Sequence, residues 1–423
     1  MRAPRPPRSR VVAIGDELLN GSRVDSNSAV LGAWLTRNGY AHLGTRTVGD
    51  EVAAIVAALA TAAHEADLIL VTGGLGPTPD DRTRQALSAW SESDLREDPA
   101  VVAALQARAD AAGRPMGRSN RVQALVPSAG RAILNPAGTA PALVLCHCGV
   151  TLVAMPGVPS EVAALLEGPV GEFIADWPGL LPFTEVQVRT TRVAESILAD
   201  QLRGVPRDPR ISLAYLPHLT GVDLVLQAPK ELRGLLEAET RAIVERIMTP
   251  VFALGHRTLE EIVGETLSSR DLKVAIAESC TGGLILSRLT DVPGASRYVV
   301  GGVVAYANEG KVSALGVRAS TLEHHGAVSE PAAIEMAEGL RERSKADLAL
   351  ATTGIAGPGG GSNEKPVGTI WVALADAHQT KTELLRLTGT RAQIKARATQ
   401  YALDLLRLHL APVSSNTLFP VDD

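Results

Sequence analysis

The sequence predicts an α/β protein with two separate sheets covered by helices, joined by a small α+β module. Short apolar runs alternate with helical patterns near both ends of the chain, which is typical of sheets with helices packed on their faces. A length of 423 residues exceeds one ordinary domain. The helix-breaking stretch PGLLPF interrupts the pattern at 178–183. We therefore predict three domains, at residues 9–170, 183–254 and 257–412.

The first domain begins with an alternation of strands and helices. The predicted elements are strands at 10–15, 41–48 and 66–74 and helices at 27–39 and 51–66. Such an alternation implies a parallel sheet covered on both faces, with ligands bound where the strands end. Two polar, glycine-containing loops follow strands there, GDELLNGSRVDSN at 15–27 and GGLGPTPDDRT at 73–83.

The other two domains alternate strands and helices at different scales. In the middle domain we expect strands at 185–192 and 221–228 and helices at 194–204 and 230–248. In the third we expect helices at 259–271, 284–292, 331–344 and 392–410 and strands at 273–277, 297–306, 346–354 and 369–375. The middle domain is thus predicted to be a compact α+β module, and the third to hold a second sheet covered by helices.

Composition limits the classes of partner. The formal net charge is -5 and aromatic residues make up 3% of the chain. Both values argue against a nucleic-acid surface, because such surfaces are usually basic and often carry stacking rings. The three cysteines fit a reducing cytoplasm and imply no zinc site. No apolar run is long enough to span a bilayer, and the N-terminus lacks the apolar core of a signal peptide, so we expect a cytoplasmic protein.

A serine stands where a strand meets the next helix, in the motif AESCTGG at 277–283. Backbone N–H groups at 280–283 would then point at the ligand that Ser279 faces, as they do in phosphate and oxyanion sites. The alternative is that Ser279 only caps the following helix, which is the commoner use of serine at such a position. The motif alone leaves both interpretations open.

A second polar cluster ends the next strand, where Tyr306, Asn308 and Lys311 are close in the sequence. Serine becomes a nucleophile only if a neighbour removes its proton, and a lysine can do so if its pKa falls well below about 10.4. Tyr306 could relay that proton. The alternative for Lys311 is a solvated lysine at a helix start. Cys280 is a rival nucleophile without an imidazole partner, so we expect a small buried cysteine there.

The stretch ATTGIAGPGGGSNEKPVGTIWVAL at 351–374 places a glycine-rich loop between two apolar runs. At Gly357, Gly359, Gly360 and Gly361 no Cβ hinders the approach of the backbone to a phosphate or another anion. The alternative is a long flexible connection between two strands. From the pattern alone, both an anion-binding loop and a plain connection are open.

Four ordered motifs, AESCTGG, GGVVAYANEGK, HGAVSEP and TTGIAGPGGGSNEKPVGT, resemble the C-terminal domain of the CinA (competence/damage-inducible protein A) family. That family includes nicotinamide-mononucleotide amidohydrolases, so the resemblance implies hydrolysis of the nicotinamide carboxamide to nicotinate mononucleotide and ammonia, with no cofactor. It assigns the nucleophile to Ser279 and its activation to Tyr306 and Lys311. It also implies substrate contacts by Thr281, Gly282, Gly283, Asn308, Thr353, Gly354, Gly357, Gly359, Gly360, Gly361, Lys365 and Arg391. One departure is Ala307, where many relatives have serine.

The first domain resembles the molybdopterin-binding-like N-terminal domain of the same family, in the motifs AIGDELLNGSRVDSN, VTGGLGPTPDDRT, NPAGTAPAL and MPGVPSE. Some relatives hydrolyse ADP-ribose there with a divalent metal ion, which Asp80 and Asp81 would hold. The resemblance also implies nucleotide contacts by Gly15, Glu17, Gly73, Gly74 and Gly76. The alternative is that the two aspartates cap the next helix, and that the domain only binds nucleotide or is inactive. Asp16 replaces the threonine of many relatives.

The middle domain resembles the KH-like module of full-length family members, but it lacks the GXXG loop with which KH folds hold nucleic acid. We therefore expect a spacer or a dimer contact, and a homodimer whose ligands are pyridine nucleotides and ADP-ribose. The leading hypothesis is a two-site enzyme of pyridine-nucleotide salvage. The alternatives are an enzyme active only through its N-terminal domain and a non-catalytic partner protein in competence or DNA repair.

Overall fold

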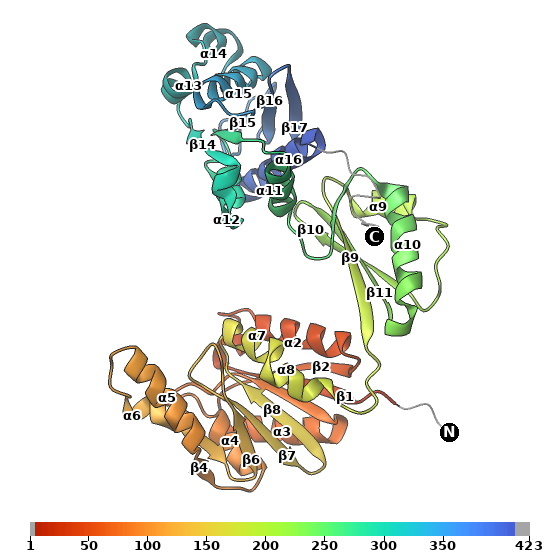
Figure 1. The fold of residues 1–423 in the computed structure, drawn as a ribbon, viewed down its shortest axis with the longest axis vertical. Helices are drawn as coiled ribbons and strands as arrows, with labels where there is room; N and C mark the ends of the chain where they lie inside the picture. The colour runs from red at the N-terminus through yellow and green to blue at the C-terminus, as the bar shows by residue number, and fades with distance from the viewer. Residues whose placement is uncertain (1–4, 411–423) are drawn as a thin grey trace. The chain divides into compact units, whose positions relative to one another are not determined.

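The computed structural model describes residues 5–410, and the chain divides into two compact units, Met1–Thr184 and Glu185–Asp423. The predicted fold class is confirmed, because helices pack on a six-stranded and a five-stranded sheet and a small four-stranded sheet lies between these in the sequence (Figure 1). The predicted end of the third domain, residue 412, lies outside the described residues. No helix in the described part of the chain is long and apolar enough to cross a membrane.

The first unit is built on a six-stranded sheet with the strand order β2-β1-β3-β8-β7-β6. Its strands are β1 (Arg8–Ile14), β2 (Ala41–Val48), β3 (Leu68–Thr72), β6 (Gly130–Ile133), β7 (Ala142–His147) and β8 (Val150–Met155). β1, β2, β3 and β8 are parallel, but β7 pairs antiparallel with both β8 and β6. The strands predicted at 10–15, 41–48 and 66–74 are thus parallel as expected, whereas the antiparallel edge was not predicted. Cys148 and Gly149, with φ of 50° and 75°, close a tight hairpin between β7 and β8.

Helices cover both faces of this sheet. The helices of this unit are α1 (Asp16–Leu19), α2 (Ser26–Arg37), α3 (Val52–Glu65), α4 (Thr83–Trp90), α5 (Pro99–Ala111), α6 (Arg118–Arg121), α7 (Pro159–Glu167) and α8 (Pro169–Ala175). The unit also contains the 3-10 turn η1 (Val122–Ala124) and the short paired strands β4 (Leu95–Glu97) and β5 (Leu125–Pro127). One core includes residues of α3 and α4, and a second includes residues of α2, α7 and α8. Every residue of β3 is buried, as expected for a strand covered on both faces.

The second unit begins with the four-stranded sheet, in the order β10-β11-β9-β12. Its elements are β9 (Phe183–Thr190), α9 (Glu195–Gln201), β10 (Ser212–His218), β11 (Gly221–Pro229), η2 (Lys230–Leu232), α10 (Arg233–Ile247) and β12 (Val251–Leu254). Side chains of α9 and α10, such as Leu198 and Ile243, share one core with Val188 of β9 and Leu224 of β11. The predicted compact α+β module is therefore present.

The five-stranded sheet follows in the same unit, in the order β14-β13-β15-β16-β17. Its strands are β13 (Val274–Glu278), β14 (Val299–Val304), β15 (Leu348–Gly354), β16 (Thr369–Ala375) and β17 (Thr380–Arg386). Its helices are α11 (Leu259–Ser269), α12 (Leu284–Asp291), α13 (Asn308–Leu315), α14 (Ala319–His325), α15 (Glu330–Ser344) and α16 (Arg391–Leu410), with the 3-10 turn η3 (Ala295–Arg297). One core includes α11, α12 and α16, and the other includes α13 and α15. β14, β13 and β15 are parallel, so their C-terminal ends meet at one edge of the sheet.

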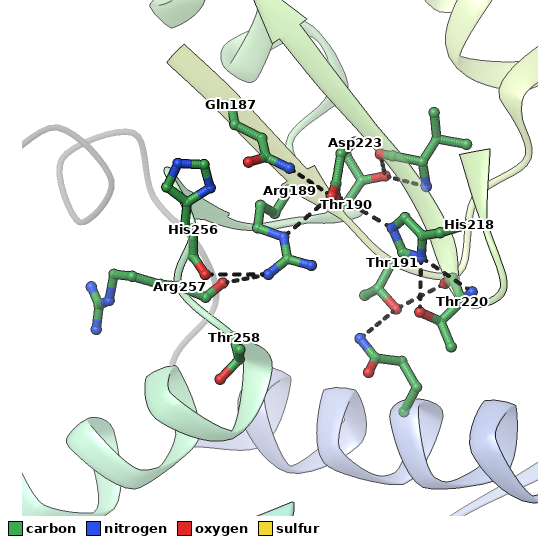
Figure 2. A network of polar contacts seen from close by, with 12 residues as sticks. Gln187, Arg189, Thr190, Thr191, His218, Thr220, Asp223, His256, Arg257 and Thr258 are labelled. Carbon is green, nitrogen blue, oxygen red and sulfur yellow. Dashed lines mark hydrogen bonds and ion pairs between the residues drawn. The ribbon is translucent and has the colours of Figure 1, made fainter. Parts of the chain in front are cut away.

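Polar contacts join the four-stranded sheet to the helices of the five-stranded one (Figure 2). Arg189 of β9 donates a hydrogen bond to the carbonyl oxygen of Arg257, just before α11 (3.0 Å), and its guanidinium lies 3.4 Å from the buried carboxylate of Asp223. Gln400 of α16 donates to the hydroxyl of Thr191 (3.2 Å). These contacts explain why the two sheets belong to one compact unit.

Candidate functional site

Ser279 lies at the C-terminal end of β13, beside the end of β15. Glu278 pairs in parallel register with Thr352, and the Ser279 N–H donates to the Thr352 carbonyl oxygen at 2.9 Å. Ser279 is buried, with 7% of its surface exposed. The next helix begins only at Leu284 and takes Gly283 as its N-cap. The alternative in which Ser279 merely caps that helix is therefore wrong.

The N-terminus of α12 is filled by a carboxylate of the protein itself. Glu278 is buried, and its carboxylate accepts hydrogen bonds from the N–H groups of Gly283 (2.9 Å), Ile285 (3.2 Å) and Leu286 (2.9 Å). A negative charge at a helix N-terminus is stabilised by the unpaired N–H groups and by the helix dipole. The expectation that the Gly283 N–H faces a ligand is therefore wrong, because Glu278 already occupies it.

Lys311 of α13 reaches the serine from the neighbouring strand end. Its Nζ donates to Ser279 Oγ (3.1 Å) and to the carbonyl oxygens of Ala305 (3.0 Å) and Tyr306 (3.4 Å). Only 2% of the residue is exposed, so the alternative of a solvated lysine is wrong. If the amine is neutral, its two N–H groups can remain on the two carbonyl oxygens while its lone pair faces the serine hydroxyl.

Burial lowers the pKa of Lys311 below its usual value. None of the ion pairs found among the described residues joins Lys311 to a carboxylate, and the nearby Glu278 carboxylate is turned to the helix N–H groups. The same burial raises the pKa of the Cys280 thiol to about 12. Cys280 therefore remains a protonated thiol at neutral pH, whereas the Ser279 hydroxyl is in direct contact with the Lys311 amine.

Tyr306 and Arg391 pair with each other at the rim of the site. The Tyr306 side chain is exposed, and its hydroxyl accepts a hydrogen bond from Arg391 Nη2 (2.5 Å). Arg391 Nη1 also donates to the carbonyl oxygen of Gly357 (2.6 Å). No hydrogen bond joins the Tyr306 hydroxyl to Ser279 or Lys311 within residues 5–410. The predicted proton relay through Tyr306 thus has no direct path in this structure.

These side chains surround a cavity of about 210 Å³. Of the sequence-predicted site residues, the cavity lining includes Ser279, Tyr306, Asn308, Lys311, Thr353, Gly354 and Arg391. The residues that were predicted but lie outside this lining are Thr281, Gly282, Gly283, Gly357, Gly359, Gly360, Gly361 and Lys365. The Thr281 hydroxyl is buried against that of Thr352 (2.8 Å), and Lys365 Nζ donates to the His325 carbonyl oxygen (2.7 Å).

Sequence reasoning missed three lining residues, Ala327, Val328 and Ala356. The first two belong to the motif HGAVSEP and Ala356 belongs to TTGIAGPGGGSNEKPVGT, and the family resemblance included both motifs. All three side chains are small and apolar, however, and only their place in the folded chain brings them to the cavity. These motifs were therefore the one signal that pointed to them.

The glycine loop owes part of its composition to its own packing. A Cβ at Gly357 would lie 2.7 Å from a methyl carbon of Val367, and one at Gly361 would lie 2.8 Å from the Val367 backbone nitrogen. A Cβ at Gly359 would meet nothing within 4 Å. Glycine is thus needed at 357 and 361 so that the loop can fold onto Val367, whereas Gly359 faces open space.

A matched pair of substitutions tests this account of the loop. Neither Gly359 nor Gly361 has a positive φ, so alanine adds only a methyl group at each. We expect Gly361→Ala to lower the melting temperature by a few degrees, because such overpacking costs about 1–3 kcal/mol. Gly359→Ala should leave it unchanged. Thermal unfolding of the two full-length variants checks this, and equal melting temperatures would contradict the packing explanation.

The first unit contains a second cavity, of about 360 Å³. Its lining includes every residue predicted for the N-terminal site, namely Gly15, Glu17, Gly73, Gly74, Gly76, Asp80 and Asp81. It also includes polar residues that sequence reasoning missed, such as Asn27, Asp50 and Glu161. Burial raises the pKa of Asp50, and the nearby carboxylates of Asp16, Glu17 and Asp80 raise it further. The cavity is therefore a polar, acidic pocket at the strand ends.

Asp81 stabilises its own loop. Its carboxylate accepts hydrogen bonds from the N–H groups of Gly76 (2.8 Å) and Thr78 (2.9 Å), and the helix that follows uses Arg82, not an aspartate, as its N-cap. Within residues 5–410 no group of three or more His, Cys, Asp or Glu side chains could hold a metal ion. The pair Asp80 and Asp81 therefore does not cap the helix, and the metal ion that the family resemblance implies there stays a prediction.

We expect Asp81→Asn to destabilise the protein without changing the chemistry of the second unit. An asparagine has one acceptor oxygen where the loop uses two, and the loss of one hydrogen bond in this partly exposed loop costs about 0.5–1.5 kcal/mol. Denaturant unfolding of the full chain should show this loss, and the exposed neighbour Asp80→Asn should lose less. Equal stability of Asp81→Asn and the parent protein would show that these hydrogen bonds are unimportant.

Two family models match the chain, "CinA C-terminal domain" over residues 256–410 and "Probable molybdopterin binding domain" over residues 10–175. A CinA-like protein of Chlorobium limicola is 40% identical over 413 residues, covering 93% of this chain and 95% of the relative. A CinA-like protein of Chlorobaculum tepidum is 41% identical over 415 residues, covering 95% and 98%. The crystal structure of competence/damage inducible protein CihA from Agrobacterium tumefaciens is 41% identical, covers 36% of this chain and 93% of its own, and has a TM-score of 0.35. Since its relatives match it over nearly their whole length, this chain belongs to the CinA family.

Proposed function

We propose that the second unit hydrolyses the carboxamide of nicotinamide mononucleotide, giving nicotinate mononucleotide and ammonia. The observation that supports this most directly is the buried contact of 3.1 Å between Lys311 Nζ and Ser279 Oγ. A lysine held in a buried place without a carboxylate partner destabilises the fold, and such groups are typical of functional sites. The non-catalytic alternative offers no reason for this arrangement.

The two side chains supply the nucleophile and the base for acyl transfer. Ser279 Oγ attacks the carboxamide carbon while its proton passes to neutral Lys311 Nζ, which forms a tetrahedral intermediate. The protonated Lys311 then gives its proton to the departing nitrogen, and ammonia leaves an ester on Ser279. Water attacks this ester, again with Lys311 as the base, and the carboxylic acid is released with the serine restored.

The size of the cavity limits which part of the substrate it can enclose. A volume of about 210 Å³ suits the pyridine ring and its carboxamide, because pockets that enclose a whole ligand usually measure about 300–1,000 Å³. The nucleotide phosphate would then lie at the rim, where Arg391 of α16 provides N–H donors. Lys395, one helical turn after Arg391, lies beside the turn at Gly282. A Cβ built at Gly282 would be 3.2 Å from the Nζ of Lys395. Both cations favour a phosphorylated substrate.

The test is ammonia release by the full-length protein supplied with nicotinamide mononucleotide. We expect stoichiometric ammonia and nicotinate mononucleotide, and much slower release from free nicotinamide, which lacks the phosphate. Folded protein that releases no ammonia from the nucleotide at any pH between 6 and about 10, a range that spans a lowered lysine pKa, would overturn this proposal.

A second candidate function concerns the first unit. We propose that its cavity binds a nucleoside diphosphate such as ADP-ribose, because all the sequence-predicted nucleotide contacts line one pocket of about 360 Å³. Calorimetry with ADP-ribose, with and without a divalent metal ion, should detect binding. Assays for ADP-ribose hydrolysis with and without a divalent metal ion decide whether the cavity is also an active site.

A further inference from the structure

The Thr353 hydroxyl uses its one proton in a hydrogen bond to the protein backbone. Thr353 is buried, with 1% of its surface exposed, and its Oγ1 donates a hydrogen bond to the carbonyl oxygen of Ala327 at 2.7 Å. A threonine hydroxyl has a single proton to donate and two lone pairs that can accept. With its proton on Ala327, Thr353 can offer only acceptor lone pairs to a molecule in the cavity that it lines.

Thr353 lies next to the nucleophile. β13 and β15 are parallel neighbours in which Glu278 pairs with Thr352, so the residues that follow, Ser279 and Thr353, are adjacent across the strand ends. Neighbouring strands lie about 4.8 Å apart. A carbonyl carbon placed for attack lies about 3–3.5 Å from the serine oxygen. One of the two heteroatoms attached to that carbon can therefore reach the Thr353 hydroxyl.

We propose that Thr353 is a specificity-determining residue that selects the carboxamide over the carboxylate. This inference rests on the deamidation proposed above. An amide nitrogen has two N–H donors, so it pairs well with an acceptor. The carboxylate product has only acceptors, and its oxygen would face the lone pairs of Thr353 without a proton between them. The same hydroxyl thus orients the carboxamide, with its nitrogen toward β15, and disfavours the product.

The experiment compares substrate and product on a protein that cannot turn over. In the full-length Ser279→Ala variant, calorimetry gives the Kd of nicotinamide mononucleotide and that of nicotinate mononucleotide, which share the ribose and the phosphate. The pH is held where the wild-type protein is active, because Lys311 is then neutral and does not attract the product. We expect the amide to bind about tenfold more tightly, which is the typical effect of one hydrogen bond gained or lost.

Two further variants locate this preference. In the first, Thr353→Val is combined with Ser279→Ala, which removes the acceptor hydroxyl but keeps a side chain of similar shape. The Kd of nicotinate mononucleotide divided by that of nicotinamide mononucleotide should then fall to near one. Adding Thr353→Ser keeps the hydroxyl, so the ratio should remain. Thermal unfolding checks that each variant is folded. If the valine variant is unfolded, the ratio in the Ser279→Ala protein still tests the idea, since product binding as tight as substrate binding overturns it.

Failure of this inference is distinguishable from failure of the proposed function. The wild-type protein could release ammonia from the amide while Thr353→Val leaves the Kd ratio of the Ser279→Ala protein unchanged. That result would support deamidation but show that Thr353 does not determine its specificity. Wild-type protein that neither binds nicotinamide mononucleotide nor releases ammonia would remove both.

Discussion

Ser279→Ala should abolish ammonia release from nicotinamide mononucleotide while the protein remains folded. Loss of a nucleophile typically lowers kcat by about a thousandfold or more, because no other group can form the covalent intermediate. Cys280 cannot replace it, since burial holds that thiol protonated. The cost in stability should be small, because the serine hydroxyl loses one hydrogen bond, worth about 0.5–1.5 kcal/mol.

The matched control is Ser287→Ala, an exposed serine of α12. It removes the same hydroxyl from the helix that follows the nucleophile, so it should retain full activity. Ammonia release and thermal unfolding are measured for both variants and the parent. A folded Ser279→Ala protein with a rate near that of the parent would show that Ser279 is not the nucleophile.

Replacing Lys311 should have an effect of similar size. Lys311→Met leaves Ser279 without a base, and Lys311→Arg puts a permanently protonated group in its place, so both should lose nearly all turnover. Exposed Lys381 provides a control, since Lys381→Met makes the same side-chain substitution at an exposed position far from the serine in the sequence. An active Lys311→Arg enzyme would show that the base is another group.

The pH dependence follows from the lowered pKa of Lys311. Only the neutral amine accepts the serine proton, so kcat/KM should fall as the pH drops through that pKa. Stability should change in the same direction. Between the folded pKa and the ordinary value of 10.5 the unfolded chain holds a proton that the folded protein lacks, so the free energy of unfolding rises with pH in that window.

Lys311→Met removes this linkage. At pH values below the folded pKa the parent must bury a charged amine, so the methionine variant should be more stable than the parent there, and the difference should shrink as the pH rises toward 10.5. Denaturant unfolding at several pH values measures this. If the Lys311→Met protein is less stable than the parent at every pH measured, the buried lysine does not destabilise the fold, and this account is contradicted.

Much of the second unit was predictable from local sequence. The last helix was expected at 392–410 and spans Arg391–Leu410, because its apolar residues recur with the helical period. Ser279 and Lys311 could be paired in advance, since each follows a strand and parallel strands end at one edge of a sheet. In contrast, the hairpin of β7 and β8 was missed, because a short apolar run does not reveal its direction.

The sequence by itself determined the family, many of the strands and helices, and the places of Ser279 and Lys311 after neighbouring strands, since all of these depend on motifs or on periodicity within a few residues. Only the tertiary structure decided what the neighbouring groups do. It turned the Glu278 carboxylate to the start of α12, folded the glycine loop onto Val367, and paired Tyr306 with Arg391, 85 residues away. These contacts are set by how the helices and loops pack around the sheet, and residues far apart in the chain give no local sign of such packing.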